Sequence, residues 1–181
     1  MNARTILSMI VLAALVTFLG GFIQFAGAQE LEALADIEDG TGKVVGRATL
    51  TQNLPGGGVW IQVNVSGLTP GEHGIHLHAA GTCSAPGFLS AGGHFNPEAR
   101  KHGLMSFDGS HAGDMPNLVA SSGGTAQYGA ANYRVTLGPG LNSLFDADGS
   151  ALVIHAGPDD HVTDPAGNAG SRVLCGILRR R

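Results

Sequence analysis

The sequence contains few charged residues and no cluster of basic side chains before its last three positions. Charged residues make up 13% of the 181, and the formal net charge is −4. Proteins that bind nucleic acids neutralise phosphates with clustered Lys and Arg, so no nucleic-acid partner is expected. The run Arg179-Arg180-Arg181 is typical of a solvated chain end, and weak adhesion to an anionic surface is the alternative.

Long apolar stripes with the helical period of 3.6 residues are also missing after residue 28. Short runs of alternating apolar and polar residues take their place, separated by Gly and Pro turns, and such runs predict strands. They lie at residues 33–37, 44–51, 59–65, 74–78, 133–137, 151–155 and 173–178. Seven or eight short strands with these turns predict an all-β fold, an antiparallel sandwich or barrel.

The first 28 residues differ from the rest. Arg4 stands before an uncharged, mostly apolar run at 6–28, which ends in the small residues Ala26-Gly27-Ala28. This layout is typical of a secretory signal peptide, whereas an uncleaved membrane anchor is the alternative, because the run is about long enough to span a bilayer. We expect removal of 1–28 and one extracytoplasmic domain at 29–181. Its net charge would be −4 minus the single charge of Arg4, which is −5.

Cysteine is scarce, with only Cys83 and Cys175 present. An even count in an exported chain suggests one disulfide, and two buried free thiols are the alternative. Two stretches rich in turn residues, 79–117 and 156–171, each begin directly after a histidine. Loops of this length are uncommon inside a compact domain unless they are functional.

The histidines suggest metal binding. His76 and His78 alternate along a predicted strand, so both imidazoles lie on one face, where they suit a transition metal or form an exposed pair. The long loop adds three imidazoles and a carboxylate, which make a closed tetrahedral set suited to zinc. These residues are His94, His102, His111 and Asp114. If His94 also joins His76, His78 and His155, four imidazoles favour copper.

The flanking residues resemble those of a known family. The motifs are His73-Gly74-Ile75-His76-Leu77-His78, Gly92-Gly93-His94-Phe95-Asn96-Pro97, Lys101-His102-Gly103, His111-Ala112-Gly113-Asp114, Gly167-Asn168-Ala169-Gly170-Ser171-Arg172 and Cys175-Gly176. From about residue 33 to 177, the chain resembles the copper–zinc superoxide dismutases. The resemblance implies a Greek-key β-sandwich with two long functional loops, bound copper and zinc, and conversion of superoxide to oxygen and hydrogen peroxide.

The resemblance also implies roles for individual residues. Copper would take His76, His78, His94 and His155, and zinc would take His94, His102, His111 and Asp114. His94 would then bridge the two ions as a catalytic residue, and Arg172 would guide the anion to copper. Asp159 would link ligands of the two metals, and Cys83 and Cys175 would form the disulfide. Two histidines fall outside these sets: we expect His73 to be structural and His161 to lie at the surface.

Loop lengths indicate a bacterial member of this family. The segment between Cys83 and His94 is longer than in eukaryotic members, and the segment between His155 and Arg172 is shorter. We expect no stable protein partner beyond a homodimer, and membrane contact only if residues 1–28 are retained. Three other functions remain as alternatives: a catalytically inactive relative that binds copper and zinc, a zinc-only protein, and a zinc hydrolase. A hydrolase needs an open zinc position, which the predicted closed set lacks.

Overall fold

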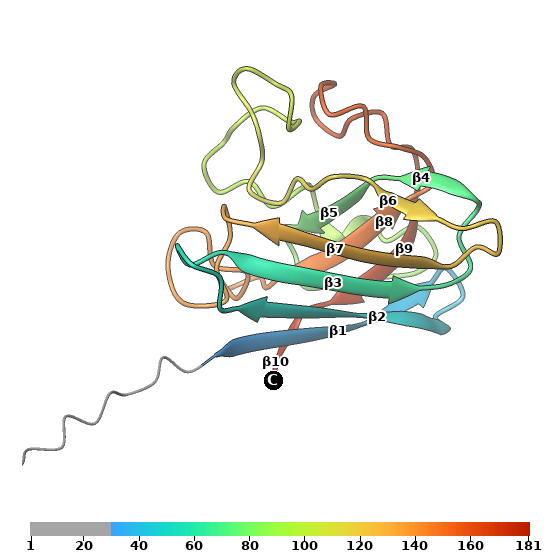
Figure 1. Cartoon of the computed structure of the whole chain (residues 1–181), viewed down its shortest axis with the longest axis horizontal. Coiled ribbons are helices and arrows are strands. Elements are labelled where there is room, and N and C mark those ends of the chain that lie inside the picture. The colour runs from blue at the N-terminus through green and yellow to red at the C-terminus, as the bar shows by residue number, and fades with distance from the viewer. Residues whose placement is uncertain (1–29) are drawn as a thin grey trace, which may run out of the picture.

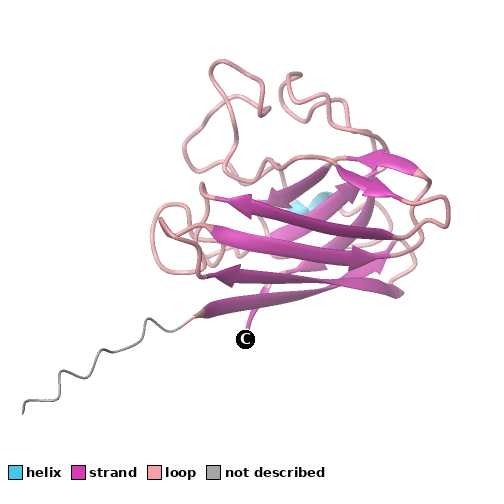
Figure 2. Ribbon diagram, in the orientation of Figure 1, coloured by secondary structure: helices cyan, strands magenta, loops and turns pink. Residues whose placement is uncertain are grey.

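The computed structural model describes residues 30–181, which fold into antiparallel strands with long connecting loops (Figures 1 and 2). The strands are β1 Leu31–Asp39, β2 Val44–Gln52, β3 Val59–Val65, β4 Gly71–His73, β5 Ile75–His78, β6 Leu118–Ala120, β7 Ala126–Asn132, β8 Ala151–His155, β9 Arg172–Ile177 and β10 Arg179–Arg180. One short 3-10 helix, η1 Leu89–Ala91, lies between β5 and β6. The predicted signal segment, 1–28, lies outside the described residues. Residues 30–181 contain no helix with the length and hydropathy of a membrane-spanning segment.

One antiparallel sheet forms most of the fold, with strand order β5-β8-β9-β1-β2-β3-β7 and β10 paired with β1. β4 and β6 form a separate two-stranded sheet. The first three strands pair in sequence order, β7 joins β3, and the chain then crosses to place β8 beside β5. The large sheet curls into a half-barrel (Figure 1). The prediction of an all-β fold with two long loops is therefore confirmed.

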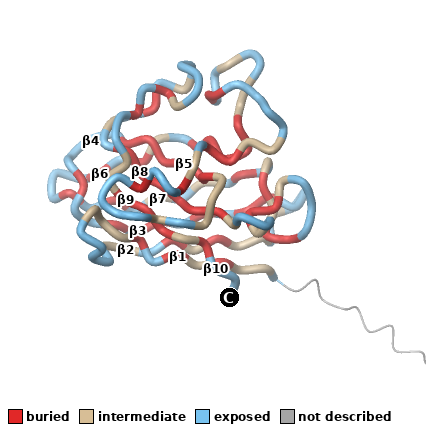
Figure 3. Tube along the Cα trace, turned by 180° about the vertical axis from the view of Figure 1, so that it is seen from behind, coloured by how far each residue is buried: buried red, intermediate tan, exposed pale blue. Residues whose placement is uncertain are grey.

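The core lies between the two halves of the curled sheet (Figure 3). In β3 the predicted alternation is complete, because Val59, Ile61 and Val63 are buried while Trp60 and Gln62 face outward. Leucine and isoleucine side chains from β2, β5 and β8 meet these valines in one cluster. Each fully buried side chain of this kind contributes roughly 1.5–3 kcal/mol to the free energy of unfolding. This core gives the site a rigid base.

The strand predicted at 133–137 is wrong, because the structure places β7 at Ala126–Asn132 instead. Val135 and Leu137 are both buried, which produced the alternating pattern. The sheet nevertheless ends at Asn132. Beyond it, the Gln52 side-chain oxygen accepts hydrogen bonds from the Leu137 amide and the Thr136 hydroxyl, in place of a neighbouring strand. A side chain can satisfy backbone groups that would otherwise need a strand partner.

Two loops, 79–117 and 156–171, rise on the same side of the sheet, in green-yellow and orange-red in Figure 1. Their tips are joined by hydrogen bonds. The Met105 amide donates to the His161 carbonyl at 3.1 Å, and the His102 amide donates to Asp164 Oδ1 at 2.8 Å. Gly103 has a φ of 106° and lies directly against the His161 carbonyl, where a Cβ atom would collide. The loops therefore form one cover above β5 and β8.

Candidate metal centre

Strand β5 presents its two histidines to the space beneath this cover. His76 and His78 are both 0% exposed, which rules out the alternative of an exposed pair on a solvated sheet. Ile75 and Leu77 point to the opposite side and join the core. β5 is the end strand of the large sheet, and its pairing with β8 fixes the positions of the two imidazoles.

The main chain of the long loop binds the other edge of β5. The Leu77 amide donates to the Gly113 carbonyl at 3.0 Å, and the Leu77 carbonyl accepts from the Phe95 amide at 2.8 Å. The Gly113 amide in turn donates to the Phe95 carbonyl at 2.8 Å. Only glycine fits at 113, since a Cβ atom would collide with the Leu77 carbonyl. These bonds hold His94 and Asp114, the neighbours of Phe95 and Gly113, against the strand.

Four imidazoles form the first group of candidate ligands, which we name the four-nitrogen set: His76, His78, His94 and His155. One ring nitrogen of each is buried and has no hydrogen-bond partner among residues 30–181. These atoms are His76 Nδ1, His78 Nε2, His94 Nε2 and His155 Nε2. Buried polar atoms are normally paired, so four unpaired nitrogens within reach of one another fit a bound metal ion.

The other nitrogen of each ring has a partner that fixes the ring's orientation. His78 Nδ1 donates to the Gly92 carbonyl at 3.0 Å, and His155 Nδ1 donates to the Gly170 carbonyl at 3.2 Å. His76 Nε2 lies 2.7 Å from Asp159 Oδ2. A hydrogen bond of this kind fixes the tautomer and leaves the second nitrogen as a lone-pair donor. The unpaired nitrogens are therefore ready to bind a metal.

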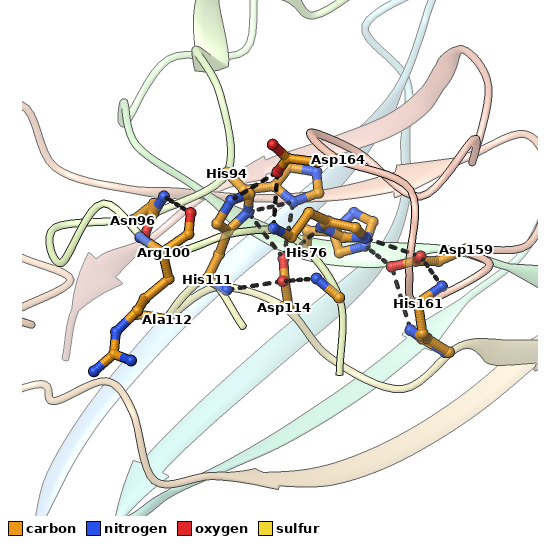
Figure 4. Close-up of polar contacts among 12 residues, drawn as sticks. His76, His94, Asn96, Arg100, His111, Ala112, Asp114, Asp159, His161 and Asp164 are labelled. Carbon is orange, nitrogen blue, oxygen red and sulfur yellow. Dashed lines mark hydrogen bonds and ion pairs between the residues drawn. The ribbon is translucent and has the colours of Figure 1, made fainter. Parts of the chain in front are cut away.

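The second group, named the His₃Asp set, consists of His94, His102, His111 and Asp114. The Nδ1 atoms of the three rings converge on Asp114 Oδ1, at 2.9, 3.1 and 3.3 Å (Figure 4). Asp114 Oδ2 instead accepts hydrogen bonds from the Gly103 and His111 amides, each at 2.9 Å. The carboxylate thus has one oxygen fixed by the main chain and one among the imidazoles. Three nitrogens and one oxygen are a donor set that suits tetrahedral zinc.

His94 belongs to both groups, through Nε2 in the four-nitrogen set and through Nδ1 in the His₃Asp set. Asp159 makes a second connection, because its Oδ2 pairs with His76 and its Oδ1 lies 3.0 Å from His102 Nε2. Figure 4 shows that Asp159 and Asp114 lie on opposite sides of the imidazole rings. Asp159 is held in turn by Asn117, whose side chain exchanges two hydrogen bonds with its main chain. The two groups form one centre.

Arg172 lies at the edge of this centre, at the start of β9. Its guanidinium donates to the Phe88 carbonyl at 2.8 Å and to the Gly92 carbonyl at 2.7 Å. It lines a cleft of about 400 Å³ together with His94 and His155. A small anion entering the cleft would meet a fixed positive charge beside two imidazoles of the four-nitrogen set.

Burial and neighbouring charge divide the histidines into two kinds. Burial lowers the pKa of His76 to about 3 and the pKa of His155 to about 4, so both rings are neutral at pH 7. Burial would lower the pKa of His102 too, but hydrogen bonds with Asp114 and Asp159 outweigh it and raise that pKa to about 9. Those same bonds hold the pKa values of both carboxylates well below their usual range, although burial opposes this.

The predicted metal ligands, Asp159 and Arg172 lie in or beside this centre, while some of their partners could not be predicted. His161 was expected at the surface, but its side chain is 18% exposed and its amide donates to Asp159 Oδ1 at 2.6 Å. His73 is buried between the carbonyls of His155 and Thr69, as a structural histidine should be. Asp164, which belongs to none of the motifs, joins the two loops through the His102 amide. Such main-chain contacts leave no motif in a sequence.

Cys83 and Cys175 form the predicted disulfide, with their Cα atoms 5.8 Å apart. The bond ties loop 79–117 to β9. Phe88 and Gly92, whose carbonyls hold Arg172, lie in that same loop. The disulfide therefore fastens the segment that positions the guanidinium.

A curled antiparallel sheet that holds six histidines and one aspartate as two joined donor sets defines a two-metal β-sandwich protein. The family model for copper/zinc superoxide dismutase (SODC) matches residues 44–178, and the chain belongs to this family.

Named relatives agree with this. The chain is 47% identical over 154 residues to superoxide dismutase [Cu-Zn] 2 of Aquifex aeolicus, covering 84% of this chain and 89% of the relative. It is 48% identical over 157 residues to superoxide dismutase [Cu-Zn] 1 of the same organism, covering 86% and 92%. A crystal structure of a SOD-like protein from Bacillus subtilis has a TM-score of 0.77 at 35% identity, and the match covers 81% of this chain and 97% of that one.

Proposed function

We propose that this protein is a copper–zinc superoxide dismutase, which converts two superoxide ions and two protons to oxygen and hydrogen peroxide. The observation that carries the proposal is the position of His94, whose two nitrogens belong to two different donor sets. Four imidazoles favour copper, and three imidazoles with one carboxylate favour zinc. We therefore assign copper to the four-nitrogen set and zinc to the His₃Asp set.

Copper bound in the four-nitrogen set would supply the one-electron oxidation and reduction that dismutation needs and that zinc lacks. The chain's own residues provide the rest. Arg172 attracts and orients the anion in the cleft, because a fixed positive charge in a concave site raises the local concentration of anions. Its two carbonyl partners hold the guanidinium in place without neutralising its charge.

His94 is the residue best placed to handle a proton. Its Nε2 atom is buried beside the cleft and has no partner among the described residues, while Asp114 holds its Nδ1 side at 2.9 Å. Nε2 can therefore hold a proton in one half of the cycle and donate it to the reduced product in the other. Asp159 keeps His76 and His102 oriented through both halves.

The other functions fit this arrangement less well. A zinc-only protein does not account for the four unpaired nitrogens, for which copper is the favoured metal. An inactive relative does not account for a fixed arginine in a cleft beside two of those rings. A zinc hydrolase needs an open ligand position at zinc, whereas the His₃Asp set is already complete with four donors.

A comparison of metal-loaded forms tests the proposal. The domain at 29–181 is prepared metal-free, loaded with zinc alone or with both metals, and assayed for superoxide decay by stopped-flow absorbance. We expect rapid dismutation only in the form that holds copper. Equal rates in the two forms would contradict the proposal, and copper bound without any activity would support the inactive relative instead.

We also propose that residues 1–28 are a cleaved signal peptide and that the mature protein works outside the cytoplasm. The support is the composition of that segment, together with a disulfide, which persists in oxidising compartments. N-terminal sequencing of the protein from the cell envelope and the medium tests this, and the expected first residue is Gln29. An intact Met1 in the membrane fraction would indicate an uncleaved anchor.

A further inference from the structure

Residues 111–114 form a turn that carries two ligands of the His₃Asp set. This turn is held by Asn132, the last residue of β7, and by Arg134. Asn132 Nδ2 donates to the Ala112 carbonyl at 2.8 Å. Arg134 Nε donates to the His111 carbonyl at 3.2 Å, and its Nη2 donates to the Asp114 carbonyl. Two side chains thus bind three of the four carbonyls in this turn.

These two side chains are themselves fixed. Asn132 is 1% exposed, and its Oδ1 accepts a hydrogen bond from the Arg134 amide at 2.9 Å. Asn132 also pairs with Val59 of β3, at the end of a seven-residue register between β3 and β7. The half-buried guanidinium of Arg134 loses part of its hydration, which is costly unless its N–H groups find acceptors. The two carbonyls supply those acceptors, so the contact between the sheet and the turn is specific.

The orientation of these peptides determines where the ligands point. His111 and Asp114 leave the turn at positions whose carbonyls Arg134 fixes, and their side chains meet at 3.3 Å, between His111 Nδ1 and Asp114 Oδ1. A planar guanidinium can bind two carbonyls at once and so sets the spacing between them. An ammonium group is a point charge on a flexible stem and cannot impose that spacing.

We propose that Arg134 and Asn132 are positioning residues for the zinc site, which hold His111 and Asp114 in place before the metal binds. The proposal rests on the assignment of zinc to the His₃Asp set made above. Arg134 contacts no metal, and its part is to raise zinc affinity and slow zinc release by preorganising two ligands. Partners of metal ligands commonly change metal affinity by roughly 10- to 100-fold.

Three variants of the mature protein, loaded with copper and zinc, test this. Arg134→Met removes the donors, Arg134→Lys keeps the charge but not the planar fork, and Arg47→Met is the matched control. Arg47 is an exposed arginine on β2 whose guanidinium pairs, among residues 30–181, only with the exposed Asp36. The readouts are zinc release to a chelator and, with Co²⁺ in place of zinc, the visible d–d spectrum, which reports ligand geometry directly.

We expect zinc release to be on the order of 10-fold faster in Arg134→Met and in Arg134→Lys, with a changed Co²⁺ spectrum, and no change in Arg47→Met. Arg134→Lys guards against a general folding defect, because its metal-free thermal stability should stay near that of the parent. Parental release and spectra in both Arg134 variants would overturn the inference. A lower metal-free stability of Arg134→Lys with an unchanged Co²⁺ spectrum would also overturn it, because Arg134 would then stabilise the fold without positioning the ligands.

The parent protein separates this inference from the proposed function. If the parent binds no zinc at the His₃Asp set, the assignment of zinc fails, and the inference fails with it. If the parent binds zinc tightly and the Arg134 variants match it, only the inference fails. The Co²⁺ spectrum of the parent distinguishes these two results before any variant is compared.

Discussion

At the scale of single residues, the chemistry depends on what each side of an imidazole contacts. His94 has one nitrogen beside Asp114 and the other free toward the cleft, so one ring serves two donor sets. His76 and His102 differ from it, because each has one nitrogen in a donor set and one on Asp159. Replacing any of these rings should therefore have a characteristic effect on metal content.

His94→Ala should abolish most of the dismutation, because it removes a ligand from both sets and the candidate proton donor as well. The expected result is superoxide decay close to the background rate, with lower retention of zinc and copper. Arg47→Met is a suitable control, since Arg47 is exposed on β2 and lies outside both sets. Parental activity in His94→Ala would show that the bridged mechanism is wrong.

Arg172→Ala should slow turnover while both metals stay bound, because Arg172 belongs to neither donor set. The loss should be smaller in Arg172→Lys, which keeps the positive charge. The measurement is the dismutation rate against ionic strength, since the attraction of an anion by a fixed charge is screened by salt. Loss of both metals from Arg172→Ala would instead mean that its bonds to the Phe88 and Gly92 carbonyls are its main role.

As the pH is lowered, the affinity for zinc should decrease more steeply than the affinity for copper. His102, with a pKa of about 9, is protonated at pH 7 in the metal-free protein and must lose that proton to offer Nδ1 to zinc. From this group alone, zinc affinity falls roughly tenfold per pH unit below about 9. His76 and His155, with pKa values of about 3 and 4, are already neutral, so they add no such dependence near neutral pH.

Competition titrations with a chelator at pH 6 and pH 8 measure this difference. We expect zinc affinity to drop by roughly two orders of magnitude between them, and copper affinity to change far less. Equal slopes for the two metals would contradict the assignment of His102 as the protonated ligand.

At the scale of elements, a predicted strand was confirmed where its alternation of apolar and polar residues came from packing of one face on the core. The alternation in 59–65 predicted β3 with its correct bounds, because one face of that strand packs on the core. The alternation at 133–137 predicted a strand that is absent, because a distant side chain, Gln52, replaces the strand partner there. Spacing within one segment cannot reveal a partner that is more than 80 positions away.

The same limit applies to the site. The members of the two donor sets could be predicted, because histidine and aspartate at these positions match family motifs, and their role as metal ligands stays a prediction. The contacts of Arg134 with the turn at 111–114 were not, since its partners are main-chain carbonyls that every residue has. Asp164 was missed for a similar reason, because it binds the amide of His102.

The link between loop 79–117 and β9 should contribute strongly to stability. Cys83 and Cys175 are 92 positions apart, and on the chain-entropy model a crosslink of this length adds about 4–5 kcal/mol to the free energy of unfolding. The double variant Cys83→Ser, Cys175→Ser should therefore unfold at a clearly lower urea concentration in its metal-free form. An unchanged midpoint would mean that the sheet and core hold this loop without the disulfide.

At the scale of the whole molecule, the curled sheet and the paired loops have different roles in forming the site. The sheet supplies a rigid core and places β5 and β8 side by side, and the loops cover the histidines that these strands present. The cleft beside His94, His155 and Arg172 reaches the centre from the surface. The fold thereby keeps six histidines buried and leaves a route for a small anion along this cleft.

The copper–zinc assignment requires two metals and one activity in the same molecule. The most direct test measures copper, zinc and superoxide dismutation on one sample of the mature protein. We predict a copper to zinc ratio of about one, with dismutation that rises in proportion to copper content. A sample that binds zinc alone, or one that holds both metals and does not dismutate superoxide, would contradict it.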